Sequence, residues 1–492
     1  MKRVMLIEPP QLRDWSELKG ELDCEPPVGL LYLASALREH GHRVEVLDCF
    51  QKGYDERRGF NGKVRIGLGD EEIAERIRAF KPEFVGISCI FFFNGTMARH
   101  ICKVVKEVGR NITTIMGGIY PTVYSDEVIR DESVDVVVKN EGEVSIVEIV
   151  NKGIRSGIVH NPYVEDLDTL PFPARDLINI DDYQRKAFGM TSGRKFTTVL
   201  TSRGCPFKCS FCSAHKMWTR KTRFRSAENV LREISMLKEL YGIREVHFID
   251  ENISLNKERF RKILKGLKEL DVRWTTPNGI ALFTLDEEDV ELMAESGCYS
   301  LAMAYESGNQ EVLTDIVRKP LDLQKARRLT KEVQRRGIKT RGFFIIGFPG
   351  ETKEQILDTI RFANELELDM VGMNCLRPYP QTDVYFEAEK NGMIRGCKAD
   401  DLTTKNAVIS TREFSPFWIK SIIEADRFLA LNRKRVKPFS VLFREIFSRN
   451  GMAAGLYVLA LALRYGRRMG GFRPRRGQCR AREEVYLKRL LN

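Results

Sequence analysis

Three cysteines in one short segment are the side chains of this sequence with the clearest chemical potential. Cys205, Cys209 and Cys212 stand within eight residues, in the order C-x-x-x-C-x-x-C. Thiolates are soft, strongly donating ligands, so three of them on one loop favour an iron–sulfur cluster or zinc. A closed zinc site needs four ligands, and His215 could complete it. A cluster with four irons would instead keep one iron open to an external ligand. A third interpretation is a packed loop of ordinary thiols.

Repeated strand and helix patterns surround this segment. Between Thr197 and Gly392 the sequence alternates strand and helix six times, with helical patterns such as Ser226–Gly242 and Thr352–Glu367. Six such units predict an open, partial (β/α) barrel, whose active site lies at the C-terminal ends of the strands. The cysteines directly follow the first strand, where an active-site loop belongs. The predicted strands are Thr197–Ser202, Glu245–Asp250, Val272–Pro277, Tyr299–Glu306, Lys339–Gly347 and Met370–Pro378.

The first part of the chain also alternates short apolar runs with amphipathic helical patterns, at Val28–Gly41, Glu71–Phe80 and Thr96–Gly109. This alternation predicts right-handed crossovers and a doubly wound parallel sheet. No G-x-G-x-x-G motif follows the first strand, so a nicotinamide site is not supported. The predicted strands are Val4–Glu8, Arg43–Asp48, Phe84–Ile90, Ile112–Gly118 and Val134–Val138.

These patterns predict an α/β protein in four segments. Residues 1–160 form the doubly wound domain, and residues 161–195 form a linker that holds three prolines in Asn161–Leu177. The barrel occupies residues 196–395. Residues 396–492 are expected to be mostly helical, ending in a basic, apolar tail.

Composition excludes several classes of protein. The 492 residues are 43% hydrophobic and 30% charged, the balance of a globular chain rather than a disordered, fibrous or disulfide-stapled one. Eleven cysteines without a visible secretory signal indicate a reducing compartment, so we expect a cytoplasmic protein. The formal charge is +12, but residues 433–492 hold sixteen Lys and Arg against three Glu. The rest of the chain is therefore almost neutral.

The cysteine motif on the loop after the first strand of a six-unit barrel resembles that of radical S-adenosylmethionine (SAM) enzymes. The resemblance implies that the three cysteines bind three irons of a [4Fe-4S] cluster, and that SAM chelates the fourth. An electron from a donor such as ferredoxin or flavodoxin would cleave SAM to a 5′-deoxyadenosyl radical, which abstracts hydrogen from an unactivated carbon. Phe207 and Phe211 would shield the cluster.

Four further strand ends resemble motifs of the same family. Phe248–Asn252 resembles the acidic motif that faces SAM, and Tyr305–Leu313 resembles G-x-E-S-G with Tyr305 in the place of glycine. Ile345–Thr352 is similar to the glycine-rich strand end beside the adenosine. Leu376–Thr382 resembles P-x-P-G-T, with Gln381 replacing glycine. The alternative is that these are turns any such barrel needs. The SAM contacts that the resemblance implies are Phe211, Asp250, Glu306, Ser307 and Gly347.

The first domain resembles the cobalamin-binding domain of one branch of this family, at Leu6–Pro10 and Pro26–Asp48. By this resemblance Ser88 would lie beside the nucleotide tail of cobalamin, Gly117 and Gly118 would pack against it, and Glu141–Glu143 would close the domain. The D-x-H-x-x-G loop with its cobalt-ligating histidine is absent, since no histidine precedes His40. The alternative is a domain that only supports the barrel or binds another ligand.

The tail combines clustered arginines with the apolar stretch Met452–Leu463, whose 12 residues are too short to span a bilayer. This pattern favours a helix lying on the inner face of an anionic membrane. Packing of the helix into the protein is the alternative. We do not expect nucleic-acid binding, because the sequence contains no recognition motif.

The leading functional hypothesis is C-methylation of a hydrophobic substrate (a lipid, an isoprenoid or a tetrapyrrole) with methylcobalamin as methyl donor. The whole-chain pattern also resembles the group that contains anaerobic Mg-protoporphyrin ester cyclase, hopanoid methylases and lipid-modifying enzymes. Cyclisation or oxidative carbon–carbon bond formation is therefore the second hypothesis. A metal-stabilised binding protein without enzymatic activity is the third. Neither catalytic residues beyond the cofactor ligands nor the substrate can be assigned.

Overall fold

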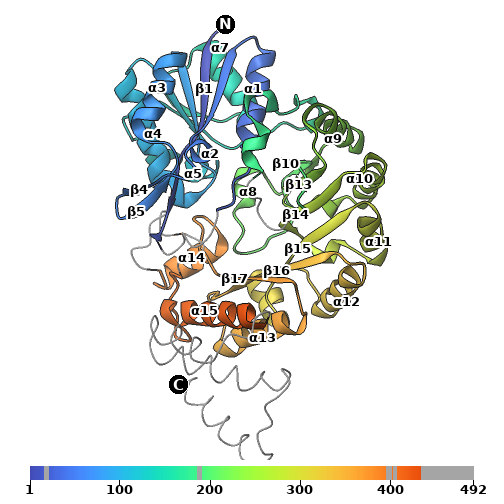
Figure 1. The fold of residues 1–492 in the computed structure, drawn as a ribbon. Coiled ribbons are helices and arrows are strands. Elements are labelled where there is room, and N and C mark those ends of the chain that lie inside the picture. The colour runs from blue at the N-terminus through green and yellow to red at the C-terminus, as the bar shows by residue number, and fades with distance from the viewer. Residues whose placement is uncertain (16–21, 185–190, 395–401, 403–406, 434–492) are drawn as a thin grey trace, which may run out of the picture.

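The computed structural model describes residues 1–433 except 16–21, 185–190, 395–401 and 403–406. Two parallel sheets dominate it, one in the N-terminal domain and one in the barrel, with the helix α8 (Ala214–Met217) between them (Figure 1). The tail beyond residue 433 lies outside the described residues, so its contact with a membrane stays a prediction. No helix within the described ranges is both long and apolar enough to cross a membrane.

The N-terminal sheet is parallel and doubly wound, as predicted. Residues alternate along its strands: Val4 and Leu6 of β1 pack under α1 and α7, whereas Met5 and Ile7 pack under α3 and α4. In order across the sheet the strands are β3 (Arg43–Asp48), β1 (Arg3–Glu8), β6 (Phe84–Ser88), β7 (Thr113–Gly117), β8 (Val136–Val138) and β9 (Gly157–Val159). The main helices are α1 (Val28–Glu39), α3 (Asp70–Phe80), α4 (Gly95–Val108) and α7 (Glu143–Lys152), and the short ones are α2 (Cys49–Lys52), α5 (Ile119–Val123) and α6 (Ser125–Val128).

Two features of this domain were not predicted. The sheet has a sixth strand, β9, which is only three residues long. A small antiparallel sheet joins β2 (Gln11–Arg13), β5 (Lys63–Ile66) and β4 (Arg57–Phe60). The turn between β4 and β5 is Asn61-Gly62, with φ of +47° and +79°. Asn-Gly is a strong hairpin signal, but charged strands of four residues give no clear alternation.

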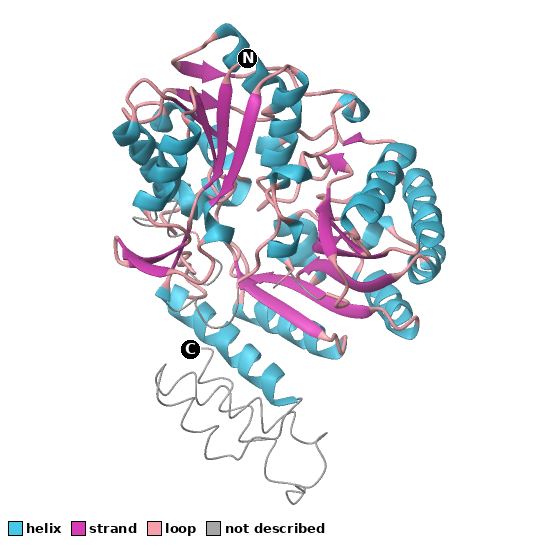
Figure 2. Ribbon diagram, turned by 45° about the horizontal axis from the view of Figure 1, so that its top comes forward, coloured by secondary structure: helices cyan, strands magenta, loops and turns pink. Residues whose placement is uncertain are grey.

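The barrel is open, as predicted. Its six parallel strands lie in sequence order, with no pairing between the outermost two among the described residues. They are β10 (Phe196–Val199), β13 (Glu245–Phe248), β14 (Arg273–Ile280), β15 (Cys298–Glu306), β16 (Lys339–Ile346) and β17 (Met370–Cys375). Helices α9 (Ala227–Tyr241), α10 (Lys257–Leu270), α11 (Glu287–Glu295), α12 (Leu323–Arg335) and α13 (Lys353–Glu365) cover the outer face (Figures 1 and 2).

Each of these outer helices begins at a polar residue whose side chain accepts a hydrogen bond from the main-chain N–H three residues later. Such caps satisfy amide groups that the helix itself leaves without partners. The five capping residues are Ser226, Asn256, Asp286, Asp322 and Thr352. The sequence therefore fixes where each helix starts, and with it the length of the preceding loop at the C-terminal end of the strand.

The strands of the barrel separate a helix-facing layer from an inner face. On β16, Phe344 is fully buried and stacks on Tyr305 with ring centroids 5.1 Å apart, while Phe343 lies on the other face. A Cβ added to Gly279 would lie 3.5 Å from both Phe343 and Ala304, which places these three residues together on the inner face.

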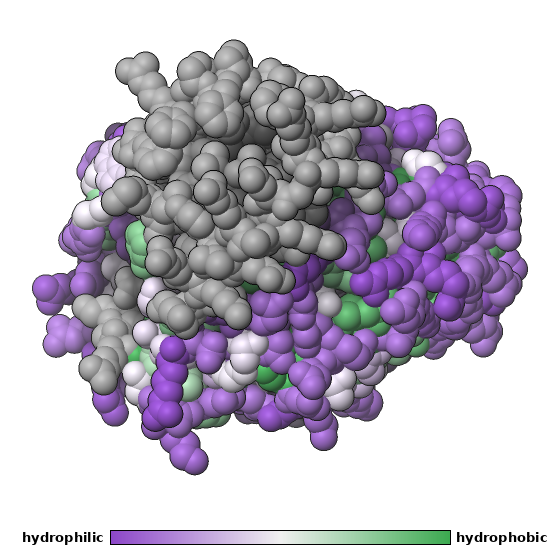
Figure 3. All heavy atoms as spheres, turned by 90° about the horizontal axis from the view of Figure 1, so that it is seen from below, coloured by the Kyte–Doolittle hydropathy of each residue, from purple (hydrophilic) through white to green (hydrophobic). Residues whose placement is uncertain are grey.

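In the described part of the chain, two helices follow the last barrel strand. α14 (Asp383–Lys390) comes directly after the last strand, and α15 (Pro416–Arg433) packs on β17 through buried residues such as Ile419. Seen from below, the described surface is mostly hydrophilic (Figure 3). Within the predicted helical C-terminal segment, residues 396–492, the described helix is α15.

Candidate functional site

Loops at the C-terminal ends of both sheets contact one another. Phe92, after β6, stacks on Tyr379, after β17, with ring centroids 5.1 Å apart. The side-chain amide of Gln381 donates to the main-chain oxygen of Val123 (3.0 Å). Because the carboxyl ends of parallel strands carry the binding sites of such folds, two binding edges face each other across this contact.

The cysteine loop starts and ends in a two-stranded ladder, β11 (Ser202–Arg203) and β12 (Arg223–Phe224). Gly204 has φ +93°, and a Cβ there would lie 2.4 Å from the main-chain oxygen of Lys221, so the loop needs glycine at this position. The main-chain N–H of Ser210 donates to Val317 O (3.0 Å), which attaches the loop to the barrel.

The three cysteines are partly exposed and lie within electrostatic reach of one another. Burial raises the pKa of Cys205, that of Cys209 to about 11 and that of Cys212 to about 12. Without metal these groups are therefore neutral thiols, and metal binding must displace their protons.

The donors of this loop suit an iron–sulfur cluster, because cysteine thiolates are its usual ligands. Among the described residues, no group of three or more His, Cys, Asp or Glu side chains is close enough to hold one metal ion. In an iron–sulfur cluster each cysteine binds a different iron, so the sulfurs need not converge on one point. Phe211, edge-on to Phe348 with centroids 6.0 Å apart, and Phe207, edge-on to Phe283 at 4.7 Å, flank the loop with apolar surface.

Glu306 and Ser307 lie at the end of β15. Glu306 has φ +66°, a left-handed conformation that costs free energy in a residue with a side chain. Lys319 holds it there, because its Nζ donates to Glu306 Oε1 (2.9 Å) and to Ala304 O (2.6 Å). Sequence reasoning missed Lys319, which is 6% exposed and also within electrostatic reach of Cys205 and Cys209. The hydroxyl of Ser307 instead bonds Thr359 Oγ1 (3.0 Å) and caps a turn.

Gly347 follows β16 with φ +91°. Its N–H and that of Phe348 donate to Glu351 Oε2 at 2.7 and 3.0 Å, while Glu351 Oε1 has no hydrogen-bond partner. Burial raises the pKa of Glu351 to about 7. The turn thus presents a buried carboxyl oxygen with free bonding capacity at the barrel mouth.

Asp250 and Glu251 follow β13 and behave differently. Asp250 is buried and accepts hydrogen bonds from the hydroxyls of Thr201 and Ser202, so it fixes the strand end that leads into the cysteine loop. Glu251 lies near Cys205 and Cys212, and its Oε2 has no partner. Burial raises the pKa of Glu251 to about 7. The predicted SAM contacts of Phe211, Asp250, Glu306, Ser307 and Gly347 stay predictions.

The residues predicted for cobalamin lie at the facing edge of the N-terminal sheet. Ser88 and Gly117 are register partners at the ends of β6 and β7. Three apolar side chains in the loops of this edge are exposed: Trp15 (62%), Ile90 (54%) and Phe91 (41%). Exposed apolar surface of this kind suits a large, flat cofactor that would cover it.

Gly117 and Gly118 differ in what their positions allow. Gly118 has φ +110°, and a Cβ there would lie 2.5 Å from Cys89 O, whereas the nearest atom to a Cβ on Gly117 is 3.9 Å away. We expect Gly118→Ala to lower the free energy of unfolding by about 2 kcal/mol, and Gly117→Ala to change it by less than about 0.5 kcal/mol. Urea unfolding of both cofactor-free variants checks this. Equal losses of unfolding free energy in the two variants would show that the backbone conformation at position 118 does not require glycine.

A carboxyl pair lies at the same edge. Glu8 and Asp48 are register partners at the ends of β1 and β3, and Tyr183 Oη donates to Asp48 Oδ2 (2.9 Å). Burial, then the charge of Asp48, raises the pKa of Glu8 to about 8, although Ser88 hydrogen-bonds to it. Burial raises the pKa of Asp48 to about 6.

This pair gives the cofactor-free protein a pH-dependent stability. The folded chain keeps the proton of Glu8 that the unfolded chain releases near its ordinary pKa of 4.5. The resulting stabilisation is complete below that pH and is lost as the pH rises through about 8. Because Glu8 is partly solvated, we expect a loss of roughly 2 kcal/mol between pH 6 and 9. Glu8→Gln should reduce this dependence of the unfolding free energy on pH, measured by urea titrations at several pH values. The same pH dependence in the variant as in the wild type would contradict the prediction.

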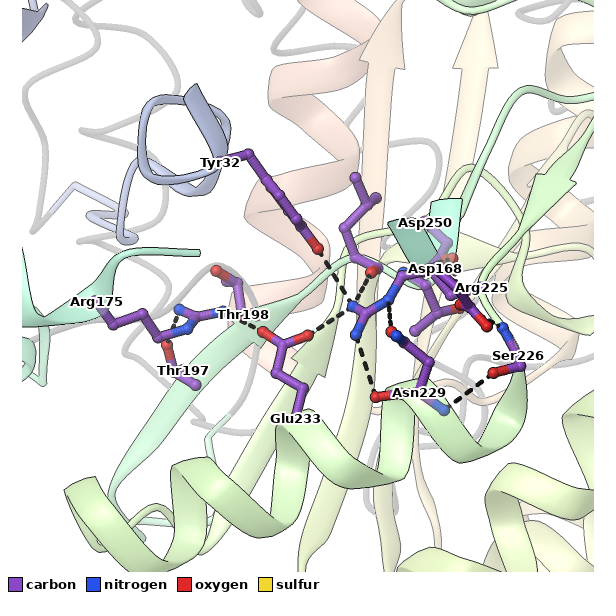
Figure 4. A network of polar contacts seen from close by, with 12 residues as sticks. Tyr32, Asp168, Arg175, Thr197, Thr198, Arg225, Ser226, Asn229, Glu233 and Asp250 are labelled. Carbon is purple, nitrogen blue, oxygen red and sulfur yellow. Dashed lines mark hydrogen bonds and ion pairs between the residues drawn. The ribbon is translucent and has the colours of Figure 1, made fainter. Parts of the chain in front are cut away.

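A buried polar network beside the barrel joins α1, the linker and α9 (Figure 4). Glu233 pairs with Arg225 Nη1 (2.6 Å) and with Arg175 Nη2 (3.2 Å), and Arg225 Nη1 also donates to Tyr32 Oη (3.2 Å). Arg175 continues to Thr197 Oγ1 (2.9 Å). Sequence reasoning missed these residues, because no local spacing reveals partners up to 193 positions apart.

Comparison with known proteins agrees with this geometry. The radical SAM superfamily model matches residues 199–363, and the B12 binding domain model matches residues 22–150. The cytidylyl-2-hydroxyethylphosphonate methyltransferase of Streptomyces wedmorensis is 31% identical over 75% of this chain and 79% of its own length. An uncharacterised methyltransferase of Pyrococcus horikoshii is 30% identical over 91% of this chain and 95% of its own. The chain belongs to the cobalamin-dependent radical SAM enzymes.

The fold agrees with that assignment. The structure of the cobalamin-dependent S-adenosylmethionine radical enzyme OxsB, with aqua-cobalamin and SAM bound, matches with a TM-score of 0.68 at 14% identity. The match covers 100% of this chain and 78% of that one. The protein is therefore an enzyme whose cofactors are a [4Fe-4S] cluster, SAM and cobalamin, and its chemistry requires an electron donor and a substrate.

Proposed function

We propose that this enzyme methylates an unactivated carbon, and that the carbon belongs to an apolar part of its substrate. The observation that carries the proposal is the contact between the C-terminal edges of the two sheets. Tyr379, in this contact, lies within electrostatic reach of Cys212, and Phe92 follows β6, whose end holds Ser88 beside Gly117, so the cysteine loop and this edge lie in the same region of the molecule. When bound, the cluster and SAM supply an organic radical, and cobalamin supplies a transferable methyl group.

The residues of this chain have separate tasks in that reaction. Cys205, Cys209 and Cys212 would hold the cluster, and Phe207 and Phe211 would limit the access of water to it. The free carboxyl oxygens of Glu251 and Glu351 would bind the polar groups of SAM, since each is buried and has no other partner. Ferredoxin or flavodoxin is the class of electron donor that we expect.

The inner face of the barrel supports the apolar part of the proposal. Phe343, Ala304 and Gly279 lie together on it, with the guanidinium of Arg341 4.8 Å from the centroid of the Phe343 ring, and Phe283 lies beside Phe207. The apolar side chains exclude water from part of this face, where the reacting carbon would lie. The relative from Streptomyces wedmorensis acts, by its name, on a cytidylyl phosphonate, so a polar group elsewhere in the substrate is compatible with this surface.

The test is anaerobic turnover of the reconstituted full chain with SAM deuterated in its methyl group, offered a lipid extract, a tetrapyrrole and a nucleotide-linked phosphonate. Methylation replaces one hydrogen atom of one of these compounds with a CD₃ group. Loss of H₂ without label would support the cyclase alternative, suggested by the resemblance to Mg-protoporphyrin ester cyclase. Protein that binds zinc but no iron, and forms no 5′-deoxyadenosine, would overturn both.

A further inference from the structure

The turn between β8 and α7 holds the middle of the cysteine loop. We call residues 140–143, the end of this turn and the first residue of α7, the clamp. Asn140 Nδ2 donates to the main-chain oxygens of Lys216 (2.9 Å) and Met217 (3.1 Å), both in α8 within the loop. Asn140 has φ +64°, a left-handed conformation that asparagine adopts more readily than most residues.

The two carboxylates of the clamp hold both ends of the same loop. Glu141 binds Arg223 through two hydrogen bonds (2.6 and 2.9 Å) and lies 3.3 Å from Arg203. Glu143 Oε1 accepts from Arg203 Nη2 at 2.6 Å. All four side chains are at most 6% exposed. Arg203 and Arg223 are direct partners in the β11–β12 ladder, so these two carboxylates compensate the repulsion between the two cations.

Contacts continue from the clamp towards the cysteines. The guanidinium of Arg203 lies over the ring of Trp218, 5.1 Å from its centroid. Trp218 hydrogen-bonds Glu251, which is within electrostatic reach of Cys205 and Cys212. Arg203 itself immediately precedes Gly204 and Cys205 in the chain. A shift of Arg203 would therefore move both the loop and its surroundings.

The clamp also contacts the edge predicted for cobalamin. The main-chain N–H of Asn140 donates to Thr122 Oγ1 (2.9 Å), and the Thr122 hydroxyl donates to Gly118 O (2.8 Å). Two hydrogen bonds thus separate Gly118 from the residue that holds α8. This route connects the two cofactor regions through the N-terminal domain itself.

We propose that the clamp fixes the cysteine loop, and with it the cluster, from the N-terminal domain. Asn140 and Glu143 are accordingly positioning residues for the cluster, although neither touches it. Other parts of the chain also anchor the loop, through the hydrogen bonds of Ser210 with Val317 of the barrel (3.0 Å) and with Val384 of α14 (3.2 Å). Filling the cobalamin edge should therefore change the environment of the cluster.

Two variants of the full chain test this, Asn140→Gly and Glu143→Gln. The first keeps a residue that tolerates left-handed backbone and removes only the amide. The control is Glu233→Gln, which removes an equally buried carboxylate between Arg175 and Arg225 outside the clamp. In cluster-free protein, we expect trypsin to cleave the loop about tenfold faster in both clamp variants, because its local opening becomes easier. In the control, trypsin should cleave the loop at the wild-type rate.

The second readout is the electron paramagnetic resonance spectrum of the reduced, reconstituted cluster. Both clamp variants should alter it, and Glu143→Asp should partly restore the wild-type spectrum. Hydroxocobalamin should change the spectrum of the wild type and have less effect on the clamp variants. Wild-type cleavage rates and spectra in Asn140→Gly and Glu143→Gln would overturn the proposal. If Glu143→Gln does not fold, Asn140→Gly alone decides, since it removes no charge.

Discussion

Cys209→Ala is expected to lower bound iron to background and to reduce formation of 5′-deoxyadenosine by at least about 100-fold. Cys209 is the middle one of the three proposed cluster ligands, and its loss would leave two thiolates for a cluster that needs three. The thiol is partly exposed, so the fold should survive its removal. Iron analysis and product quantification after anaerobic reconstitution measure both effects.

The matched control is Cys298→Ala. Cys298 begins β15, is 6% exposed and packs in the main core of the barrel. Its replacement should cost roughly 1 kcal/mol of unfolding free energy while the iron content stays at the wild-type level. Equal loss of iron in the two variants would mean that cluster binding reports the integrity of the barrel rather than specific ligation by Cys209.

Glu141→Gln is expected to lower the free energy of unfolding by about 3–5 kcal/mol, the largest stability effect that we anticipate. Burial would raise the pKa of Glu141, but the hydrogen bond from Arg223 and the charge of Arg203 outweigh it and keep the pKa low. The carboxylate is therefore ionised at neutral pH. Its removal takes away the carboxylate bound by Arg223 and leaves Arg203 paired with Glu143.

Urea unfolding followed by circular dichroism measures this loss, with Glu165→Gln as the control. Glu165 pairs with Lys221, at the same loop, but both side chains are 69% exposed. Water screens such a pair, so its loss should leave the free energy of unfolding close to that of the wild type. A loss from Glu141→Gln as small as that of the control would show that the buried ion group is not needed to hold the two domains together.

Sequence patterns predicted the parts of this protein that depend on neighbours along the chain. Cys205, Cys209 and Cys212 lie within eight residues, so their spacing alone indicates a common ligand role. Met5 and Leu6 face opposite sides of the sheet because successive side chains alternate along a strand. The open barrel follows from repeated units of the same kind. The Asn61-Gly62 hairpin was also signalled locally, although the short charged strands around it obscured the signal.

The contacts between domains could not be predicted in this way. The motif Glu141–Glu143 was recognised by resemblance, but its partners Arg203 and Arg223 lie 60 and 82 positions further along the chain. Nothing in the sequence pairs one arginine with one glutamate among 80 basic and 68 acidic residues. Lys319 was missed for a related reason, since its role depends on the left-handed backbone of Glu306.

A spectroscopic measurement tests the central claim most directly. The wild-type chain is reconstituted under anaerobic conditions with sulfide and isotopically enriched iron, and Mössbauer spectra are recorded before and after the addition of SAM. A cuboidal cluster in which a single iron site changes on addition of SAM is the expected result. Spectra without such a cluster, or with a cluster that SAM leaves unchanged, would contradict the assignment of this loop as the reactive centre.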